Sequence, residues 1–155
     1  MPALEPGDEA PGFVLEDQHG GTVRLADFLG RRVLIYFYPK AGTPYCTKQA
    51  CSVRDHLDDL RQLGVEVVGI SPDEPARLKA FDERRHLGFT LLSDPDHTVA
   101  EAYGAWGKKR LLTVGYAGII RSAFVVDEDG KIAAAFYRVG AADTVRKAQE
   151  VLNRL

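Results

Sequence analysis

The chain has 155 residues and a formal net charge of −2, with 45% hydrophobic and 27% charged residues, which is typical of one globular domain. Positive and negative residues are interspersed and no apolar run approaches the roughly 18 residues of a membrane span, so neither a nucleic-acid surface nor a membrane anchor is indicated. The first 13 residues lack the basic and apolar regions of a secretory signal, and two cysteines are too few for a disulfide-built scaffold, so we expect a cytoplasmic protein with reduced thiols.

The first half of the chain indicates a hairpin followed by alternating strands and helices. Residues 12–17 and 22–28 flank the turn sequence QHGG and predict two paired strands. Residues 31–39 form a continuous β-branched and aromatic run, as expected for a central strand that is buried on both faces. A helix is predicted over residues 43–63, and a second buried strand over residues 65–70.

In the second half, Asp73 and Pro75 open a helix that runs to Gly88. Residues 89–92 predict a short strand, and the SDPD turn cluster that follows predicts the cap of a short helix through Tyr103. Residues 104–120 carry no readable pattern.

The chain ends with the clearest hairpin and a helix. Residues 121–138 hold two apolar runs around Asp-Glu-Asp-Gly. Residues 142–155 predict an amphipathic helix whose apolar side carries Val145, Ala148, Val151, Leu152 and Leu155.

This order of elements predicts a single domain, residues 1–155, with a mostly parallel sheet covered on both faces. The late hairpin would add antiparallel strands at one side. Chemistry in open α/β sheets usually lies at the carboxyl ends of the strands. There, the strand over residues 31–39 leads into the segment that holds the only two cysteines, Cys46 and Cys51.

The position of Cys46 predicts an activated thiol. Thr43 is a good N-cap residue and Pro44 then occupies the first helical position. Cys46 would lie in the first turn, where unpaired backbone amides and the helix dipole stabilise a thiolate. Since the thiolate is the nucleophilic form, this spacing indicates a reactive cysteine.

The position of Cys51 predicts a disulfide that cannot form while the helix is intact. Cys46 begins an apolar stripe with Ala50, Val53, Leu57 and Leu60, whereas Cys51 lies about 140° around the helix. The two Cα atoms would be roughly 8.7 Å apart, and a disulfide needs about 4.4–6.8 Å. A disulfide would therefore require the start of the helix to open, which is the cheapest part to unfold.

A peroxide is a suitable substrate for such a pair. Attack on its O–O bond gives a sulfenic acid, which a second thiol converts to a disulfide that an external dithiol can reduce. The leaving oxygen needs donors, which the Thr43 hydroxyl and the amides of Tyr45 and Cys46 could supply. Arg121 is the candidate cation, because a neighbouring strand could bring it beside Cys46.

Pro39-x3-Thr43-Pro44-x-Cys46 resembles the active-site motif of the peroxiredoxins, which are thiol peroxidases of the thioredoxin fold. The fuller string FYPKAGTPYCTKQAC is similar to the Q-type subgroup, also called bacterioferritin-comigratory proteins. The blocks VVGISPD, FTLLSDPD and IIRSAFVVDEDGKI extend the resemblance over nearly the whole chain. It implies an α/β, thioredoxin-like three-layer fold with a mixed central sheet, helices on both faces and an N-terminal β-hairpin.

The resemblance also implies roles for individual residues. Cys46 would be the peroxidatic cysteine and Cys51 the resolving cysteine; Thr43 and Arg121 would bind and orient the peroxide, and Pro39 would shield the thiol. It implies hydrogen peroxide or an organic hydroperoxide as substrate, thioredoxin or a similar dithiol as reductant, no metal or organic cofactor, and a monomer or weak homodimer.

The sequence departs from the subgroup at three places. Tyr45, a candidate substrate contact, stands where glycine is common, and Ala123 stands where threonine is frequent. The segment KKRLLTVGYAGII also differs from the usual pattern. These departures concern substrate preference more than reaction type.

Other interpretations of the two cysteines remain open at this point. They could be buried core residues, because free cysteine is among the most buried residue types. His56 completes a C-x4-C-x4-H pattern, although structural zinc requires four ligands and no fourth ligand is nearby in the sequence. A redox sensor on the same fold is an alternative to an enzyme, and a disulfide oxidoreductase is disfavoured because the C-x-x-C spacing is absent.

Overall fold

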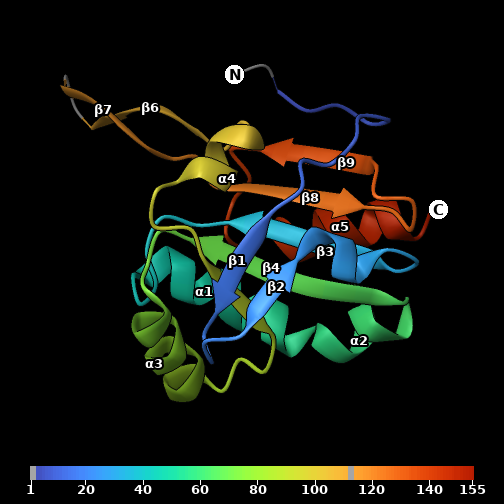
Figure 1. Cartoon of the computed structure of the whole chain (residues 1–155), viewed down its shortest axis with the longest axis horizontal. Helices are drawn as coiled ribbons and strands as arrows, with labels where there is room; N and C mark the ends of the chain where they lie inside the picture. The colour runs from blue at the N-terminus through green and yellow to red at the C-terminus, as the bar shows by residue number, and fades with distance from the viewer. Residues whose placement is uncertain (1–2, 112–113) are drawn as a thin grey trace.

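The computed structural model describes residues 3–111 and 114–155. A seven-stranded sheet has the strand order β2-β1-β5-β4-β3-β8-β9, and β6 pairs separately with β7 (Figure 1). The strands are β1 Val14–Asp17, β2 Thr22–Arg24, β3 Arg32–Phe37, β4 Val65–Ser71, β5 Thr90–Ser93, β6 Trp106–Leu111, β7 Val114–Ile119, β8 Ser122–Val126 and β9 Ile132–Tyr137.

Strand β3 is the central strand, and both of its faces are buried. Val33, Ile35 and Phe37 belong to the apolar cluster on one side of the sheet. Leu34 and Tyr36 belong to the cluster on the other side, because successive side chains of a strand point to opposite faces. The prediction of a doubly buried strand in this region is confirmed.

The sheet is mixed, with fewer parallel pairs than the order of elements suggested. Strand β4 is parallel to both β3 and β5. The other four pairings are antiparallel, because the N-terminal hairpin adds its strand β1 to β5, and β8 pairs directly with β3 and β9. The prediction of a mostly parallel sheet is therefore wrong, whereas the mixed sheet is confirmed.

Helices lie on both faces of the sheet (Figure 1). The cluster on one face includes buried side chains from α1, α2, α3 and α5. The other face is covered by α4 and by a short 3-10 helix, η1, together with part of the N-terminal segment. The bounds are η1 Leu25–Phe28, α1 Pro44–Asp55, α2 Leu57–Gln62, α3 Pro75–Arg85, α4 Thr98–Ala102 and α5 Thr144–Leu152.

Three elements differ from their predicted form. The helix expected over residues 43–63 divides into α1 and α2 at His56, whose backbone (φ −111°, ψ 10°) leaves the helical conformation. Residues 25–28 form the 3-10 helix rather than the end of a strand. Leu155 lies beyond the end of α5 and is 57% exposed, so it does not join the apolar side of that helix.

Residues 104–120, for which no pattern was predicted, include the antiparallel ribbon of β6 and β7, where Trp106 pairs with Ile119; Leu112 and Thr113 lie outside the described residues. The SDPD cluster caps α4 as predicted, since the Asp94 carboxylate accepts hydrogen bonds from the backbone amides of Val99 and Ala100.

None of the described helices is long and apolar enough to cross a bilayer.

Candidate active site

The start of α1 lies just beyond the carboxyl end of β3. After Phe37 the chain passes through Pro39 and a turn, and α1 begins at Pro44. Thr43 is the N-cap residue, with the extended backbone (φ −75°, ψ 157°) that this position requires. The predicted helix start is therefore confirmed, and it places Cys46 in the first turn.

The Thr43 side chain does not cap the helix as expected. Its hydroxyl donates instead to the carbonyl oxygen of Lys40, at 2.8 Å, and closes the turn that leads into α1. A hydroxyl has one proton and two lone pairs, so the Thr43 oxygen can still accept a hydrogen bond while it donates.

Arg121 lies directly beside the Cys46 sulfur. The Cys46 side chain is 1% exposed, and Arg121 Nη2 donates to its Sγ at 3.3 Å. Arg121 reaches this position because β8 runs antiparallel to β3 and pairs Ser122 with Phe37. A guanidinium at this distance supplies positive charge and a hydrogen-bond donor to the sulfur.

Gln49 and Thr144 hold Arg121 in place, and the sequence did not single out either residue. Arg121 Nη1 donates to Gln49 Oε1. Gln49 is fully buried, and its Nε2 donates to Thr144 Oγ1 at 2.8 Å. Thr144 Oγ1 in turn donates to the carbonyl oxygen of Gly140, at 3.1 Å.

The direction of these hydrogen bonds is fixed from the Thr144 end. Because the Thr144 hydroxyl uses its one proton on Gly140, it can only accept from Gln49. The amide nitrogen of Gln49 must then point to Thr144, and its oxygen to Arg121. Gln49 lies three residues after Cys46, on the same side of α1, and this spacing is the signal that could have identified it.

Cys51 lies in the same unbroken helix, and both cysteines are free thiols. Helix geometry therefore keeps the Cα atoms beyond the range of a disulfide. Cys51 is half-buried. One turn further on, Arg54 Nη1 donates to the carbonyl oxygen of Arg85 at 2.7 Å, which joins this end of α1 to the end of α3.

The two remaining predicted site residues lie beside the helix start. Pro39 is half-buried and follows β3 closely. The Tyr45 side chain is 71% exposed and projects from the first turn of α1, next to Cys46. The structure thus brings Cys46 and Arg121 together, with Thr43, Tyr45 and Pro39 along the chain around them.

Two buried tyrosines, Tyr36 and Tyr38, lie near Cys46. Burial, followed by the proximity of Tyr38 and Cys46, raises the pKa of Tyr36 well above its ordinary value. Burial likewise raises the pKa of Tyr38. Both phenols therefore remain neutral at physiological pH, and they add no negative charge beside Cys46.

The C-x4-C-x4-H pattern does not form a cluster of metal ligands in the described structure. Within residues 3–111 and 114–155, no three His, Cys, Asp or Glu side chains are grouped so that they could hold a metal ion.

Comparisons with known proteins agree with the geometry. Residues 6–135 match the AhpC/TSA family. The chain is 54% identical over 136 residues to peroxiredoxin Bcp of Escherichia coli K12, covering 88% of this chain and 87% of that protein. It is 53% identical over 150 residues to a putative peroxiredoxin of Mycobacterium tuberculosis H37Rv, covering 97% and 96%. Among solved structures, peroxidoxin BcpB of M. tuberculosis matches with a TM-score of 0.87 and 34% identity, over 98% of both chains.

Proposed function

Because the chain belongs to the AhpC/TSA family and is a thiol peroxidase of the peroxiredoxin Q (Bcp) group, we propose that Cys46 is the peroxidatic cysteine and Cys51 the resolving cysteine. The contact of Arg121 with the Cys46 sulfur at 3.3 Å is the observation that carries this assignment. It supplies positive charge to the buried thiol of the pair, at the amino end of a helix.

In the first step, the Cys46 thiolate attacks one oxygen of the peroxide. An S–O bond forms, the O–O bond breaks, and the leaving oxygen takes a proton from the solvent to become water or an alcohol. Arg121 stabilises the charge that develops on the leaving oxygen. Thr43 accepts a hydrogen bond from the O–H of the peroxide and so orients it, while Pro39 and Tyr45 border the approach.

In the second step, α1 opens between the cysteines and Cys51 attacks the sulfenic acid of Cys46. An S–S bond forms, the S–O bond breaks, and the oxygen leaves as water. This step requires Gln49, which lies between the cysteines, to leave both Arg121 and Thr144. Reaching the disulfide therefore dismantles the contacts that hold Arg121 beside Cys46.

In the third step, an external dithiol reduces the disulfide by thiol–disulfide exchange and α1 re-forms. We infer that thioredoxin or a similar dithiol protein has this role, and that residues 1–155 act as a single cytoplasmic domain, as a monomer or weak homodimer. A reducing compartment supports this setting, because it regenerates the thiols after each turnover.

The test is a coupled assay that follows consumption of hydrogen peroxide and organic hydroperoxides with thioredoxin, its reductase and NADPH. Turnover should fall to background in Cys46→Ser. Normal turnover in that variant would refute the assignment of Cys46. Oxidation of Cys46 by stoichiometric peroxide at the rate of a free thiol would instead favour a slow redox sensor.

A further inference from the structure

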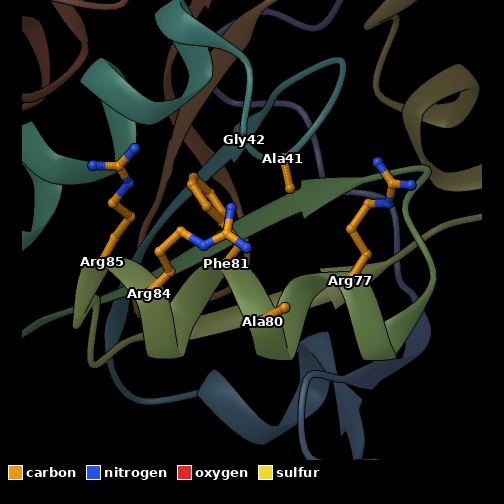
Figure 2. Close-up of a pocket in the computed structure, with 7 residues that line it drawn as sticks. All are labelled: Ala41, Gly42, Arg77, Ala80, Phe81, Arg84 and Arg85. Carbon is orange, nitrogen blue, oxygen red and sulfur yellow. The ribbon is translucent and has the colours of Figure 1, made fainter.

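A groove lined by arginines runs beside the segment that contains both cysteines. One wall is a face of α3, which carries Arg77, Ala80, Phe81 and Arg84 at steps of three and four residues, with Arg85 at its end. The opposite wall is formed by Ala41 and Gly42, which immediately precede the start of α1. Figure 2 shows the three arginine side chains rising from α3 toward this wall.

The groove carries a concentrated positive charge in a chain whose net charge is −2. Arg77 has a partial partner, since its Nε lies 3.8 Å from Asp73 Oδ1. Asp73 also accepts from the Ala41 amide at 2.7 Å. For the exposed side chains of Arg84 and Arg85, no carboxylate of the described residues lies within ion-pair distance. Their charge is therefore available to an incoming group.

The spacing of the arginines fits a surface better than a small molecule. Arg77 and Arg85 are eight residues apart on one helix, which separates their Cα atoms by about 12 Å. One carboxylate cannot contact guanidinium groups spread over that length, whereas several carboxylates on a protein face can. The same wall presents apolar surface between the arginines, at Ala80 and Phe81, and such surface is typical of the centre of a protein interface.

The α3 wall of the groove is independent of the helix opening that the reaction requires. The opening lies within residues 46–51, whereas the arginines belong to a separate helix whose Leu78 and Phe81 are buried in the core. A protein that reduces the disulfide must recognise the opened form. A docking surface on α3 remains in place in that form.

We propose that this arginine groove is the docking surface for the reducing protein, which binds through carboxylates that surround its own dithiol. The inference rests on the proposed function, because it assumes that a dithiol protein reduces the disulfide. Once docked, a thiolate of the reductant attacks Cys51 of the disulfide and releases Cys46 as a thiolate. The second thiol of the reductant then attacks the mixed disulfide and releases Cys51.

The experiment uses the full chain, oxidised by one equivalent of peroxide, and measures the rate of disulfide reduction. The probes are a thioredoxin of acidic isoelectric point and dithiothreitol, which has no protein surface. The variant is Arg84→Glu with Arg85→Glu. The control is Lys79→Glu with Arg154→Glu, which makes the same change in charge at two exposed residues outside the groove.

With the acidic thioredoxin at about 0.1 M salt, the groove variant should be reduced about tenfold or more slowly than the control, because long-range charge sets the encounter rate. The gap should narrow at about 1 M salt, where the screening length falls to about 3 Å. Reduction by dithiothreitol and oxidation of Cys46 by hydrogen peroxide should be unchanged.

Equal rates for the groove variant and the control with thioredoxin would overturn the inference. So would an equal loss with dithiothreitol, which would indicate a structural defect, or a selective loss with anionic hydroperoxides, which would assign the groove to the substrate. Failure of thioredoxin to reduce the unaltered chain would count against the proposed reductant itself, and is distinguishable from these results.

Discussion

The two cysteines lie in one helix but in contrasting surroundings. Cys46 is 1% exposed, packs within the core and contacts Arg121. Cys51 is half-buried. One turn further along α1, Arg54 donates a hydrogen bond to the carbonyl oxygen of Arg85, at the end of α3. Cys46, the proposed peroxidatic residue, is thus fixed by core packing and by Arg121 from a distant part of the chain, whereas Cys51, the proposed resolving residue, is less enclosed.

This contrast matches the two tasks of the reaction. The first step benefits from a fixed thiolate and fixed donors, since preorganised groups lose nothing when charge develops. The second step needs one thiol to travel, and the surroundings of Cys51 permit this at low cost. In the proposed mechanism Gln49, which lies between the two cysteines, takes part in both steps, because its hydrogen bonds hold Arg121 and break when the disulfide forms.

The largest expected effect is that substitution of Cys46 and substitution of Cys51 block different steps of the reaction. Cys51→Ser should leave the first oxidation of Cys46 by stoichiometric peroxide unchanged but abolish the intramolecular disulfide, since no other thiol exists in the chain. Mass spectrometry of the oxidised protein under non-reducing conditions checks this. The contrast between the cysteines fails if Cys51→Ser slows the first oxidation as much as Cys46→Ser does.

The next effect concerns the cation beside Cys46. Arg121→Gln should slow oxidation of Cys46 by roughly 100-fold, because removal of one preorganised donor typically costs that much. The rate is measured by stopped-flow with stoichiometric hydrogen peroxide. Arg138→Gln is a matched control, since Arg138 is an exposed arginine that directly follows β9. A loss of less than about twofold in Arg121→Gln would remove Arg121 from the mechanism.

A smaller effect is expected from substitution of Thr144, which should slow the first step of the reaction and accelerate the second. Thr144→Val keeps the shape but removes the acceptor that directs the Gln49 amide. We expect oxidation of Cys46 to slow by about tenfold, the value of one hydrogen bond near a charge. The subsequent disulfide should form faster, because Gln49 is released more easily.

The control for this prediction is Thr144→Ser, which retains the hydroxyl and should restore both rates. A merely structural role for Thr144 would slow both steps together, and would not be rescued by serine. Unchanged rates in Thr144→Val would show that the Gln49 amide is directed without Thr144.

The smallest effect appears at alkaline pH. Since the pKa of Tyr36 is raised in the folded protein, folded Tyr36 keeps its proton above pH 10, where an unfolded tyrosine loses it. Stability is therefore lost as the pH rises above about 10, by up to about 1.4 kcal/mol per pH unit for this tyrosine. Tyr36→Phe should lose less stability than the unaltered chain in urea unfolding between about pH 8 and pH 11. Parallel losses would contradict the raised pKa.

Local patterns in the sequence predicted most of the elements. The Thr-Pro helix start, the doubly buried β3 and the apolar stripe from Cys46 to Leu60 each depend on neighbouring residues, so short-range rules suffice. The break at His56 was missed because the apolar spacing continues across it, from Val53 to Leu57. The pattern records burial, and burial is retained on both sides of the break.

Two features could not be predicted from local sequence patterns. These are the pairing of the strands and the hydrogen bonds that hold Arg121 beside Cys46. The contact between Arg121 and Cys46 joins residues 75 positions apart, and the contact between Gln49 and Thr144 joins residues 95 positions apart. Arg121 was predicted because it begins a strand that could lie beside Cys46, and the resemblance to a known family implied the same role. Thr144 carries no local signal, because a threonine at the start of a helix is explained by its position alone.

The most direct test of the account is amide hydrogen exchange over residues 44–52 in the reduced protein and in the isolated disulfide form. With both cysteines in an intact helix, the reduced protein should protect these amides after the first turn. In the disulfide form, protection should be lost between Cys46 and Cys51 while that of β3 and α3 is retained. The same protection in both forms would contradict an opening of α1 as the route to the disulfide.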